Sequence, residues 1–330
     1  MPTCTIITYH FVRELPFTRY PRIKGLLVSR FRNQLDYLQR HYQFVSVQDC
    51  IAAVNGRAEL PSNALLLTFD DGYIEHFTTV FPILAARKIP GCFFPTAQCI
   101  LENKVLAVNK IHFILAAVSD VDRLTREILA ELNANRTHYN LESNEYYLTK
   151  LAHPNRFDPG EIIFVKRLLQ RELPEQLRYR IVDKLFSKYV TEDETAFAME
   201  LYMTADQLKL MAQCGMDIGG HGYTHRWLNK LPPDEQTQEI CQTVNFLQSL
   251  GIDTGNWVMC YPHSAYDDSL INILKQNHCQ LGLTVKSGLA ELTPQNAFEL
   301  QRLDTTDFPM AANASPCRWT QMVLNKLSLQ

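Results

Sequence analysis

The sequence predicts an α/β protein in which buried strands alternate with amphipathic helices. Seven short apolar segments, rich in β-branched and aromatic residues, have the pattern of strands. They cover residues 5–9, 64–69, 92–95, 216–218, 257–261, 281–284 and 298–303. Seven strands interleaved with helices favour a (β/α) barrel, and a doubly wound sheet is the alternative.

The individual elements follow from local patterns. Residues 64–67 (ALLL) are apolar at every position, as expected of a parallel strand that is covered on both faces. Helical periodicity is found over residues 31–40, 73–87, 204–214, 234–250 and 269–277. Three glycines follow such segments at the place where a left-handed residue often ends a helix, namely Gly91, Gly215 and Gly251.

Residues 101–200 break this alternation, because no segment there has a convincing strand pattern. Helical patterns over residues 110–118, 122–132 and 162–171 are separated by prolines. A loop of about a hundred residues is improbable inside a compact domain. We therefore predict a barrel built from residues 1–100 and 201–330, with residues 101–200 as a helical insertion between the third and fourth strands.

The composition is that of an ordinary globular protein. The 330 residues include 32 Lys and Arg against 35 Asp and Glu, for a formal net charge of −3. A nucleic-acid-binding protein needs a basic face, so no nucleic-acid partner is expected.

Nine cysteines, odd in number and without a C-x-x-C pair, argue against a disulfide framework and a cysteine zinc site. No signal-peptide pattern and no run of about 20 apolar residues is visible, so we expect a cytoplasmic protein without a transmembrane segment.

The string TFDDG (residues 68–72) directly follows the apolar run of the second strand. Two adjacent carboxylates at the end of a buried strand are costly to desolvate. Such a pair suits a site in which one carboxylate binds a cation and the other stays available as a base. The alternative is a solvated turn that caps the next helix.

The string GHGYTH (residues 220–225) follows the fourth strand and places two histidines four residues apart. By itself this is weak evidence, since about 0.3 such pairs are expected by chance in this chain. Both strings, however, leave the carboxyl ends of predicted strands, where α/β proteins build their active sites. Asp71, His221 and His225 would form a metal site with open positions for water and substrate, and Asp70 could take a proton from that water. These ligands suit Zn²⁺, with Co²⁺, Ni²⁺, Mn²⁺ and Fe²⁺ as alternatives.

The strings LLLTFDDGY, GGHGYTHRWL and CYPHSAYDD resemble the polysaccharide deacetylase family with the NodB homology domain, which is carbohydrate esterase family 4. The resemblance implies a distorted (β/α)7 barrel and a metal-dependent enzyme that removes N-acetyl groups from amino sugars. It assigns Asp70 as the general base and Asp71, His221 and His225 as metal ligands. It also implies that Tyr261 and Pro262 shape the groove wall and offer a backbone N–H to the oxyanion of the reaction.

The chain departs from the family pattern at two places. Many members have an arginine at the start of the third motif, where this sequence has Met259-Cys260-Tyr261. Many also have a catalytic-acid histidine near the last strand, where this sequence has Leu300-Gln301-Arg302-Leu303-Asp304. The general acid is therefore unassigned, with three candidates: His10, His263 and Asp304. We hypothesise that Arg302 replaces the missing arginine beside Asp70 and that His10 or His263 protonates the leaving amine.

The expected function is metal-dependent deacetylation of an N-acetylated amino sugar that serves as an intermediate for surface polysaccharide. The lack of a visible leader favours a nucleotide-linked, lipid-linked or small saccharide. Trp227 is a candidate for stacking on the sugar, and the helical insertion is expected to cover one side of the groove. One alternative is hydrolysis of another C–N bond, in a cyclic ureide or imide. The other is a non-catalytic saccharide-binding protein.

Overall fold

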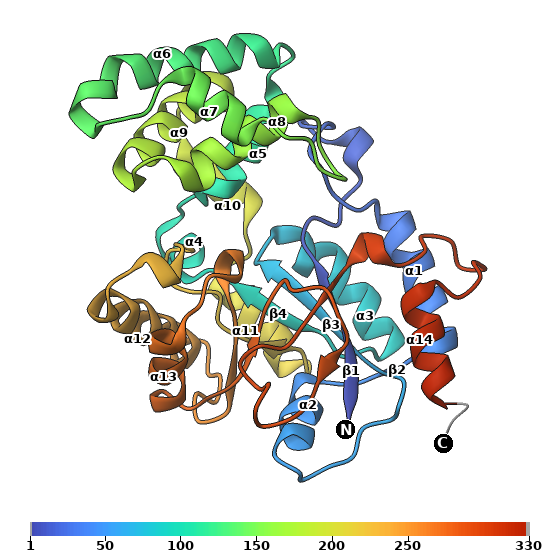
Figure 1. The fold of residues 1–330 in the computed structure, drawn as a ribbon. Coiled ribbons are helices and arrows are strands. Elements are labelled where there is room, and N and C mark those ends of the chain that lie inside the picture. Colours follow the sequence, from blue (N-terminus) through green and yellow to red (C-terminus); the bar gives the residue numbers. More distant parts are fainter. Residues whose placement is uncertain (1, 328–330) are drawn as a thin grey trace. The chain divides into compact units, whose positions relative to one another are not determined.

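The computed structural model describes residues 2–327 and divides into two compact units (Figure 1). The first unit contains the chain up to Glu14, Gly25–Asn103 and the chain from Met199 onwards. The second contains Leu15–Lys24 and Lys104–Ala198. Residues 15–24, which the sequence analysis assigned to the barrel, therefore lie in the second unit.

Seven parallel strands form a closed ring in the first unit. They are β1 (Thr3–Tyr9), β3 (Ala64–Asp71), β4 (Cys92–Pro95), β5 (Asp217–Ile218), β6 (Trp257–Cys260), β7 (Cys279–Leu283) and β9 (Leu303–Asp304). Regular pairing joins β9, β1, β3, β4 and β5 in that order, and β6 pairs with β7. Single parallel bridges, Gly220 to Met259 and Leu283 to Leu300, join these two groups. The ring confirms the distorted (β/α)7 barrel, and the doubly wound alternative is wrong.

The strand predicted over residues 298–303 is shorter than expected. Only Leu303–Asp304 forms a regular strand there, and Leu300 contributes a single bridge. Two further short strands extend the sheet: β2 (Gln43–Phe44) is parallel to β3, and β8 (Ala290–Glu291) is antiparallel to β1.

Helices surround the strands of the first unit in Figure 1. They are α1 (Val28–His41), α2 (Val47–Val54), α3 (Phe81–Arg87), α4 (Ala97–Glu102), α11 (Ala205–Gln213), α12 (Pro233–Ser249), α13 (Asp268–Gln276) and α14 (Arg318–Leu327). The helix predicted over residues 73–87 instead begins with a π-helical turn, η2 (His76–Val80), and continues as α3. The sequence analysis missed α2, whose local signal is a capping box between Ser46 and Asp49.

Side-chain alternation along the strands separates two cores. In β3, Leu65, Leu67 and Phe69 pack outward in the core that contains most of the surrounding helices. Ala64 and Leu66 belong to a second core with Ile6 of β1 and Cys260 of β6, which is the interior of the barrel. Asp70 is an even number of residues from Ala64 and Leu66, so it lies on the same face of β3. Its side chain therefore points into the barrel, at the carboxyl end of the strand.

The second unit is helical. Its helices are α5 (Ala107–Ala117), α6 (Val121–Tyr139), α7 (Asn144–Leu151), α8 (Gly160–Arg167), α9 (Glu175–Tyr189) and most of α10 (Glu194–Leu201). The ring of Tyr20 contacts the edges of Phe113 and Phe197, which explains why residues 15–24 belong to this unit. Buried Lys110 pairs with Asp183 at 2.6 Å and with Glu194 at 3.0 Å.

Two of the three predicted helix-ending glycines have the expected backbone. Gly215 and Gly251 have φ of 86° and 80°. The prediction for Gly91 is wrong, because Lys88 is the left-handed residue that ends α3. At Gly91 a Cβ would lie 2.9 Å from the side chain of Leu84, so close packing accounts for this glycine.

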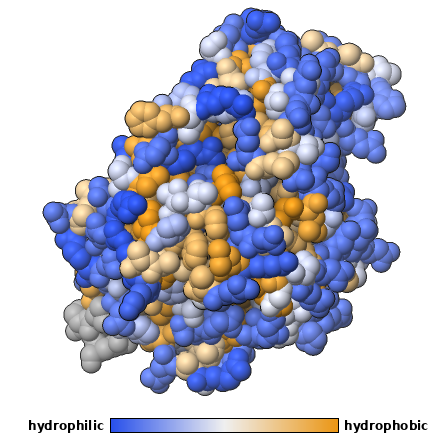
Figure 2. All heavy atoms as spheres, turned by 180° about the vertical axis from the view of Figure 1, so that it is seen from behind, coloured by the Kyte–Doolittle hydropathy of each residue, from blue (hydrophilic) through white to orange (hydrophobic). Residues whose placement is uncertain are grey.

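The surface in Figure 2 is mostly hydrophilic, with smaller apolar areas between polar side chains. The large apolar residues with the most exposed side chains include Phe17, Met199 and Val285, which are far apart in the sequence. Among the described residues, no helix is both long and apolar enough to span a bilayer.

Candidate active site

The two aspartates of the first motif occupy the last positions of β3 and are buried. Asp71 has φ of 72° and Gly72 has φ of 77°, so the chain turns through two left-handed residues immediately after the strand. A Cβ on Gly72 would lie 2.8 Å from Cβ of Pro95, which explains the glycine there. Left-handed backbone at a non-glycine residue is uncommon and tends to occur at functional sites.

Both histidines of the second motif converge on Asp71. The distance from Asp71 Oδ1 to His221 Nε2 is 3.4 Å, and the distance to His225 Nε2 is 3.5 Å. Ligand atoms of one tetrahedral ion with bonds of about 2.0–2.1 Å lie about 3.3–3.4 Å apart. The three side chains therefore have the spacing and the donor types to hold one divalent metal ion.

The tautomer of His221 is set by the barrel. Its Nδ1 lies 2.8 Å from the backbone oxygen of Cys260, so Nδ1 carries the hydrogen and Nε2 faces Asp71. A hydrogen bond of this kind to the second nitrogen is the usual support of a metal-binding imidazole.

The charges of the site respond to burial and to each other. Burial alone would raise the pKa of Asp71, but the hydrogen bond of His221 and the other imidazoles nearby lower it well below its usual value. Burial and the neighbouring imidazoles of His263 and His221 lower the pKa of His225 well below its usual value. Burial would also lower the pKa of His221, but Cys260 and Asp71 outweigh it, and the pKa is raised. A metal ion held here would have to displace a proton from His221, so its binding would strengthen as pH rises.

Asp70 is paired with Arg302. The Arg302 guanidinium donates to Asp70 Oδ1 at 2.9 Å and to Oδ2 at 2.8 Å, and the arginine is 2% exposed. Burial alone would raise the pKa of Asp70, but the charge and hydrogen bonds of Arg302 hold it well below its usual range. The carboxylate is therefore ionised and has a fixed orientation.

Comparison with known proteins agrees with this geometry. The family model for polysaccharide deacetylase matches residues 57–146 and 181–282, which is more than half of the chain. The chain belongs to the polysaccharide deacetylase family. It is also 32% identical over 133 residues to a poly-beta-1,6-N-acetyl-D-glucosamine N-deacetylase of Escherichia coli (strain K12). That match covers 37% of this chain and only 20% of the E. coli protein.

Solved structures of deacetylases share the fold along nearly the whole chain. The Streptococcus pyogenes deacetylase PplD, in complex with acetate, has a TM-score of 0.55 at 17% identity, and the match covers 98% of both chains. IcaB from Ammonifex degensii has a TM-score of 0.53 at 18% identity, covering 98% of this chain and 97% of IcaB. At these identities the likeness concerns the fold.

Two of the candidate acids, His10 and His263, lie beside the predicted metal ligands and Asp70 of this member of the polysaccharide deacetylase family. His10 Nε2 is 3.9 Å from Asp70 Oδ2, and its side chain is 48% exposed. The His263 ring stands edge-on to His225, with ring centroids 4.6 Å apart, and stacks on Trp227 at 4.5 Å. His225 and His263 both have left-handed backbone, with φ of 60° and 56°.

Three other predicted site residues have different environments from those expected. The Tyr261 N–H already donates to the oxygen of Leu283 at 3.1 Å, and Pro262 has no N–H. Neither residue can supply the expected oxyanion donor. Tyr261 is 1% exposed and donates its hydroxyl to Phe298, so it packs in the barrel wall and does not line a groove. The Asp304 carboxylate accepts hydrogen bonds from Thr306 and caps the turn that begins there, which argues against its role as the acid.

The sequence analysis missed several side chains that contact the aspartates. Thr8 Oγ1 donates to Asp70 Oδ2 at 3.2 Å, and Cys260 Sγ lies 3.5 Å from the same oxygen. The Tyr73 hydroxyl donates to Asp71 Oδ2 at 2.5 Å. Side chains along a strand point alternately into and out of the barrel, and Thr8 and Cys260 stand at inward-facing positions of β1 and β6. This alternation could have identified them.

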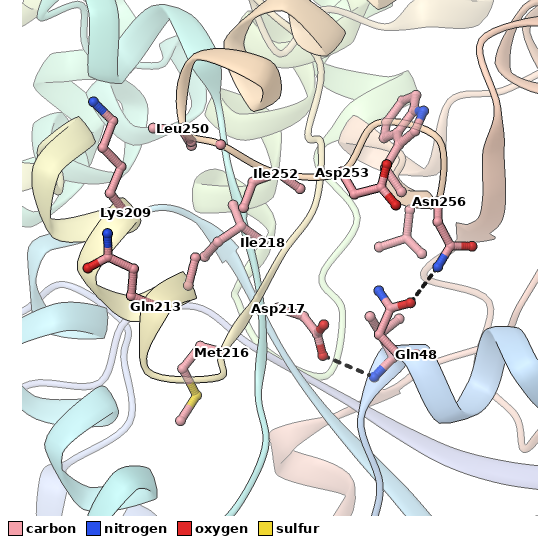
Figure 3. A pocket seen from close by; sticks show the side chains of 15 residues that line it. Gln48, Lys209, Gln213, Met216, Asp217, Ile218, Leu250, Ile252, Asp253 and Asn256 are labelled. Atoms are coloured by element: carbon pink, nitrogen blue, oxygen red, sulfur yellow. Dashed lines mark hydrogen bonds between the residues drawn. The ribbon is translucent and has the colours of Figure 1, made fainter.

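A cavity of about 490 Å³ lies at the opposite end of β5 and β6 (Figure 3). Its lining includes Asp217, which accepts from the Val47 N–H at 3.2 Å, and Asn256, which donates to Gln48 at 2.5 Å. Burial raises the pKa of Asp217. Within residues 2–327, no histidine lines this cavity, and the possible metal ligands lie at the carboxyl ends of the strands. The carboxyl ends are therefore the candidate place for the chemistry.

Proposed function

We propose that this protein is a metal-dependent hydrolase that removes the acetyl group from an N-acetylated amino sugar. The observation that carries the proposal is the meeting of Asp71, His221 and His225 around one point, next to the ionised Asp70. Membership of the polysaccharide deacetylase family supports the same reaction.

Asp71, His221 and His225 would hold the ion, and Zn²⁺ fits their donor atoms best. When bound, such an ion polarises the acetamide carbonyl and lowers the pKa of the attacking water. Asp70 accepts the proton that this water loses as its oxygen bonds to the carbonyl carbon. Arg302 keeps Asp70 ionised and correctly oriented for that transfer.

The leaving nitrogen needs a proton as its bond to the carbonyl carbon breaks. We propose that His10 supplies it, because its half-exposed imidazole ring reaches the site beside Asp70. His263 is the second candidate, but its ring lies against Trp227 and His225. The products are acetate and a free amine.

The proposed substrate is a saccharide that carries N-acetylglucosamine or a similar sugar, free or linked to a nucleotide or lipid. The name of the E. coli relative supports the sugar type.

We also propose a reducing, cytoplasmic location, because two of the free cysteines, Cys214 and Cys241, are exposed. Fractionation of producing cells tests the location, and recovery of the protein outside the cytoplasm would contradict it.

Acetate release tests the activity. The metal-loaded protein is incubated with β-1,6-linked N-acetylglucosamine oligomers, with nucleotide-linked sugars and with cyclic ureides. We expect acetate from one or more of the acetylated sugars, loss of turnover with a chelator, and loss of both bound metal and turnover in His225→Ala. The exposed His278→Ala serves as the control and should retain both. Turnover of ureides alone would favour the other C–N hydrolase, and saccharide binding without acetate release would favour a binding protein.

A further inference from the structure

His76 is fully buried at the start of the turn η2. Its Nε2 lies 2.8 Å from the backbone oxygen of His10. A carbonyl oxygen can only accept, so Nε2 carries the hydrogen. Nδ1 is then unprotonated, and within residues 2–327 it has no hydrogen-bond partner. Burial lowers the pKa of His76 to about 4, so the ring is neutral at physiological pH and keeps this tautomer.

The surroundings of His76 are aromatic. Its ring centroid lies 5.6 Å from that of Phe69, 5.5 Å from Tyr73 and 5.9 Å from Phe93. An apolar ring would fill this space without leaving a buried nitrogen unpaired, which is unfavourable. The bond to His10 is therefore the feature that distinguishes histidine from an apolar residue here.

The loop that begins at His10 is fastened from two sides. On one side, Phe11 and Arg13 exchange backbone hydrogen bonds with Leu26, at 2.8 Å and 3.0 Å. On the other side, Arg13 donates to the Glu75 carboxylate at 2.6 Å, and His76 donates to His10. The bond from His76 reaches the backbone of His10 itself.

We propose that His76 is a positioning residue that holds the His10 imidazole at the site through the His10 carbonyl. This inference rests on the proposed function, in which His10 protonates the leaving amine. Because the His10 side chain is 48% exposed, its position depends on the backbone that carries it. A displacement of about 1 Å at a reacting group can lower a rate about 100-fold.

Three variants test the proposal with an acetylated sugar as substrate. His76→Leu removes the donor, and His76→Gln keeps an N–H near the position of Nε2. His41→Leu is the matched control, because among the described residues the buried His41 Nε2, at the end of α1, has no hydrogen-bond partner either. We expect kcat to fall about 10- to 100-fold in His76→Leu with KM unchanged, to recover in His76→Gln, and to stay the same in His41→Leu.

A second substrate separates positioning from general loss of structure. The leaving group of 4-nitrophenyl acetate departs as an anion and needs no proton from an acid. His76→Leu should therefore hydrolyse this ester within twofold of the unaltered protein. An equal loss on the ester and on the sugar would overturn the proposal. If His76→Leu does not fold, His76→Phe, which suits the aromatic surroundings, replaces it.

A double-mutant cycle links His76 to His10. In the His10→Ala background, His76→Leu should lower kcat no further. A similar loss with and without His10 would show that His76 does not act through it. If His10→Ala itself keeps full turnover, the assignment of the acid in the proposed function fails, which is a different outcome.

Discussion

Arg302 and Asp70 form a buried ion pair with two hydrogen bonds between residues that are 232 positions apart. The guanidinium also donates to the backbone oxygen of Thr284 and to the Thr68 hydroxyl, so at least four of its five N–H groups have acceptors inside the barrel. A buried pair is costly to break, because the charge that remains is desolvated and unpaired. The orientation of Asp70 and the stability of the barrel therefore depend on the same arginine.

Arg302→Ala should lower the free energy of unfolding by about 3–5 kcal/mol, because Asp70 is left buried without its partner. Arg302→Lys keeps the charge but cannot make two parallel hydrogen bonds, so its loss should be intermediate. Turnover should fall in both variants. Denaturant unfolding and acetate release measure these effects, with the exposed Arg57→Ala as the control. Full stability and turnover in Arg302→Ala would contradict the assigned role.

Acid should weaken the fold partly through Asp70. Because its pKa is lower in the folded than in the unfolded chain, the unfolded chain binds the proton more readily. Ionised Asp70 contributes fully to the free energy of unfolding above about pH 4, the ordinary pKa of an aspartate in the unfolded chain. This contribution is lost as the pH falls toward the lowered pKa of Asp70 in the folded chain. Metal-free Asp70→Asn should therefore lose less stability between pH 6 and pH 3 than the unaltered protein. If both proteins lose the same free energy of unfolding between pH 6 and pH 3, the lowered pKa of Asp70 is contradicted.

The loop with the two histidines is held by helix α12. Glu239 of this helix is buried and accepts hydrogen bonds from the N–H groups of Tyr223 and Thr224, at 2.9 Å and 3.1 Å, and from the Thr224 hydroxyl. A neighbouring constraint is Gly220, where a Cβ would lie 2.6 Å from Thr243 of the same helix. The position of His221 and His225 is thus a property of the packing between α12 and the barrel.

Glu239→Gln should weaken metal binding about 10- to 100-fold. The carboxylate accepts hydrogen bonds at two oxygens, whereas the glutamine amide can accept at only one, because its other terminal atom is a donor nitrogen. Calorimetric titration with Zn²⁺ measures the affinity. Asp234→Asn, an exposed change in the first turn of the same helix, should have no effect. An unchanged affinity in Glu239→Gln would show that the loop keeps its shape without this carboxylate.

At the scale of the whole molecule, the proposed chemistry belongs to one unit. Asp70, Asp71, His221 and His225 all lie in the unit that contains the barrel. The second unit has its own buried core, which includes Leu124, Ile128 and Leu132 of α6. We propose that this helical unit influences the choice of substrate and not the chemistry.

Replacement of both parts of the helical unit, residues 15–24 and 104–198, by short linkers should leave metal binding intact and change the range of acetylated sugars that are hydrolysed. Metal content after dialysis and acetate release over the sugar panel are the two measurements. Loss of the metal in a folded variant would contradict the assignment, and an unchanged sugar range would remove the proposed role in selectivity.

The sequence by itself determined the strands of the barrel and the ends at which chemistry is expected. Apolar runs such as residues 64–67 are local signals, and the strings TFDDG and GHGYTH directly follow strands. The sequence also predicted Arg302 beside Asp70, and the structure has that pair. Tertiary structure alone decided the other hydrogen-bond partners of the site. The closed ring brings Thr8 and Cys260 to Asp70, and it leaves the Tyr261 N–H occupied by Leu283. The reason is physical: periodicity depends on neighbours along the chain, whereas a side chain's partner depends on which strands meet when the barrel closes.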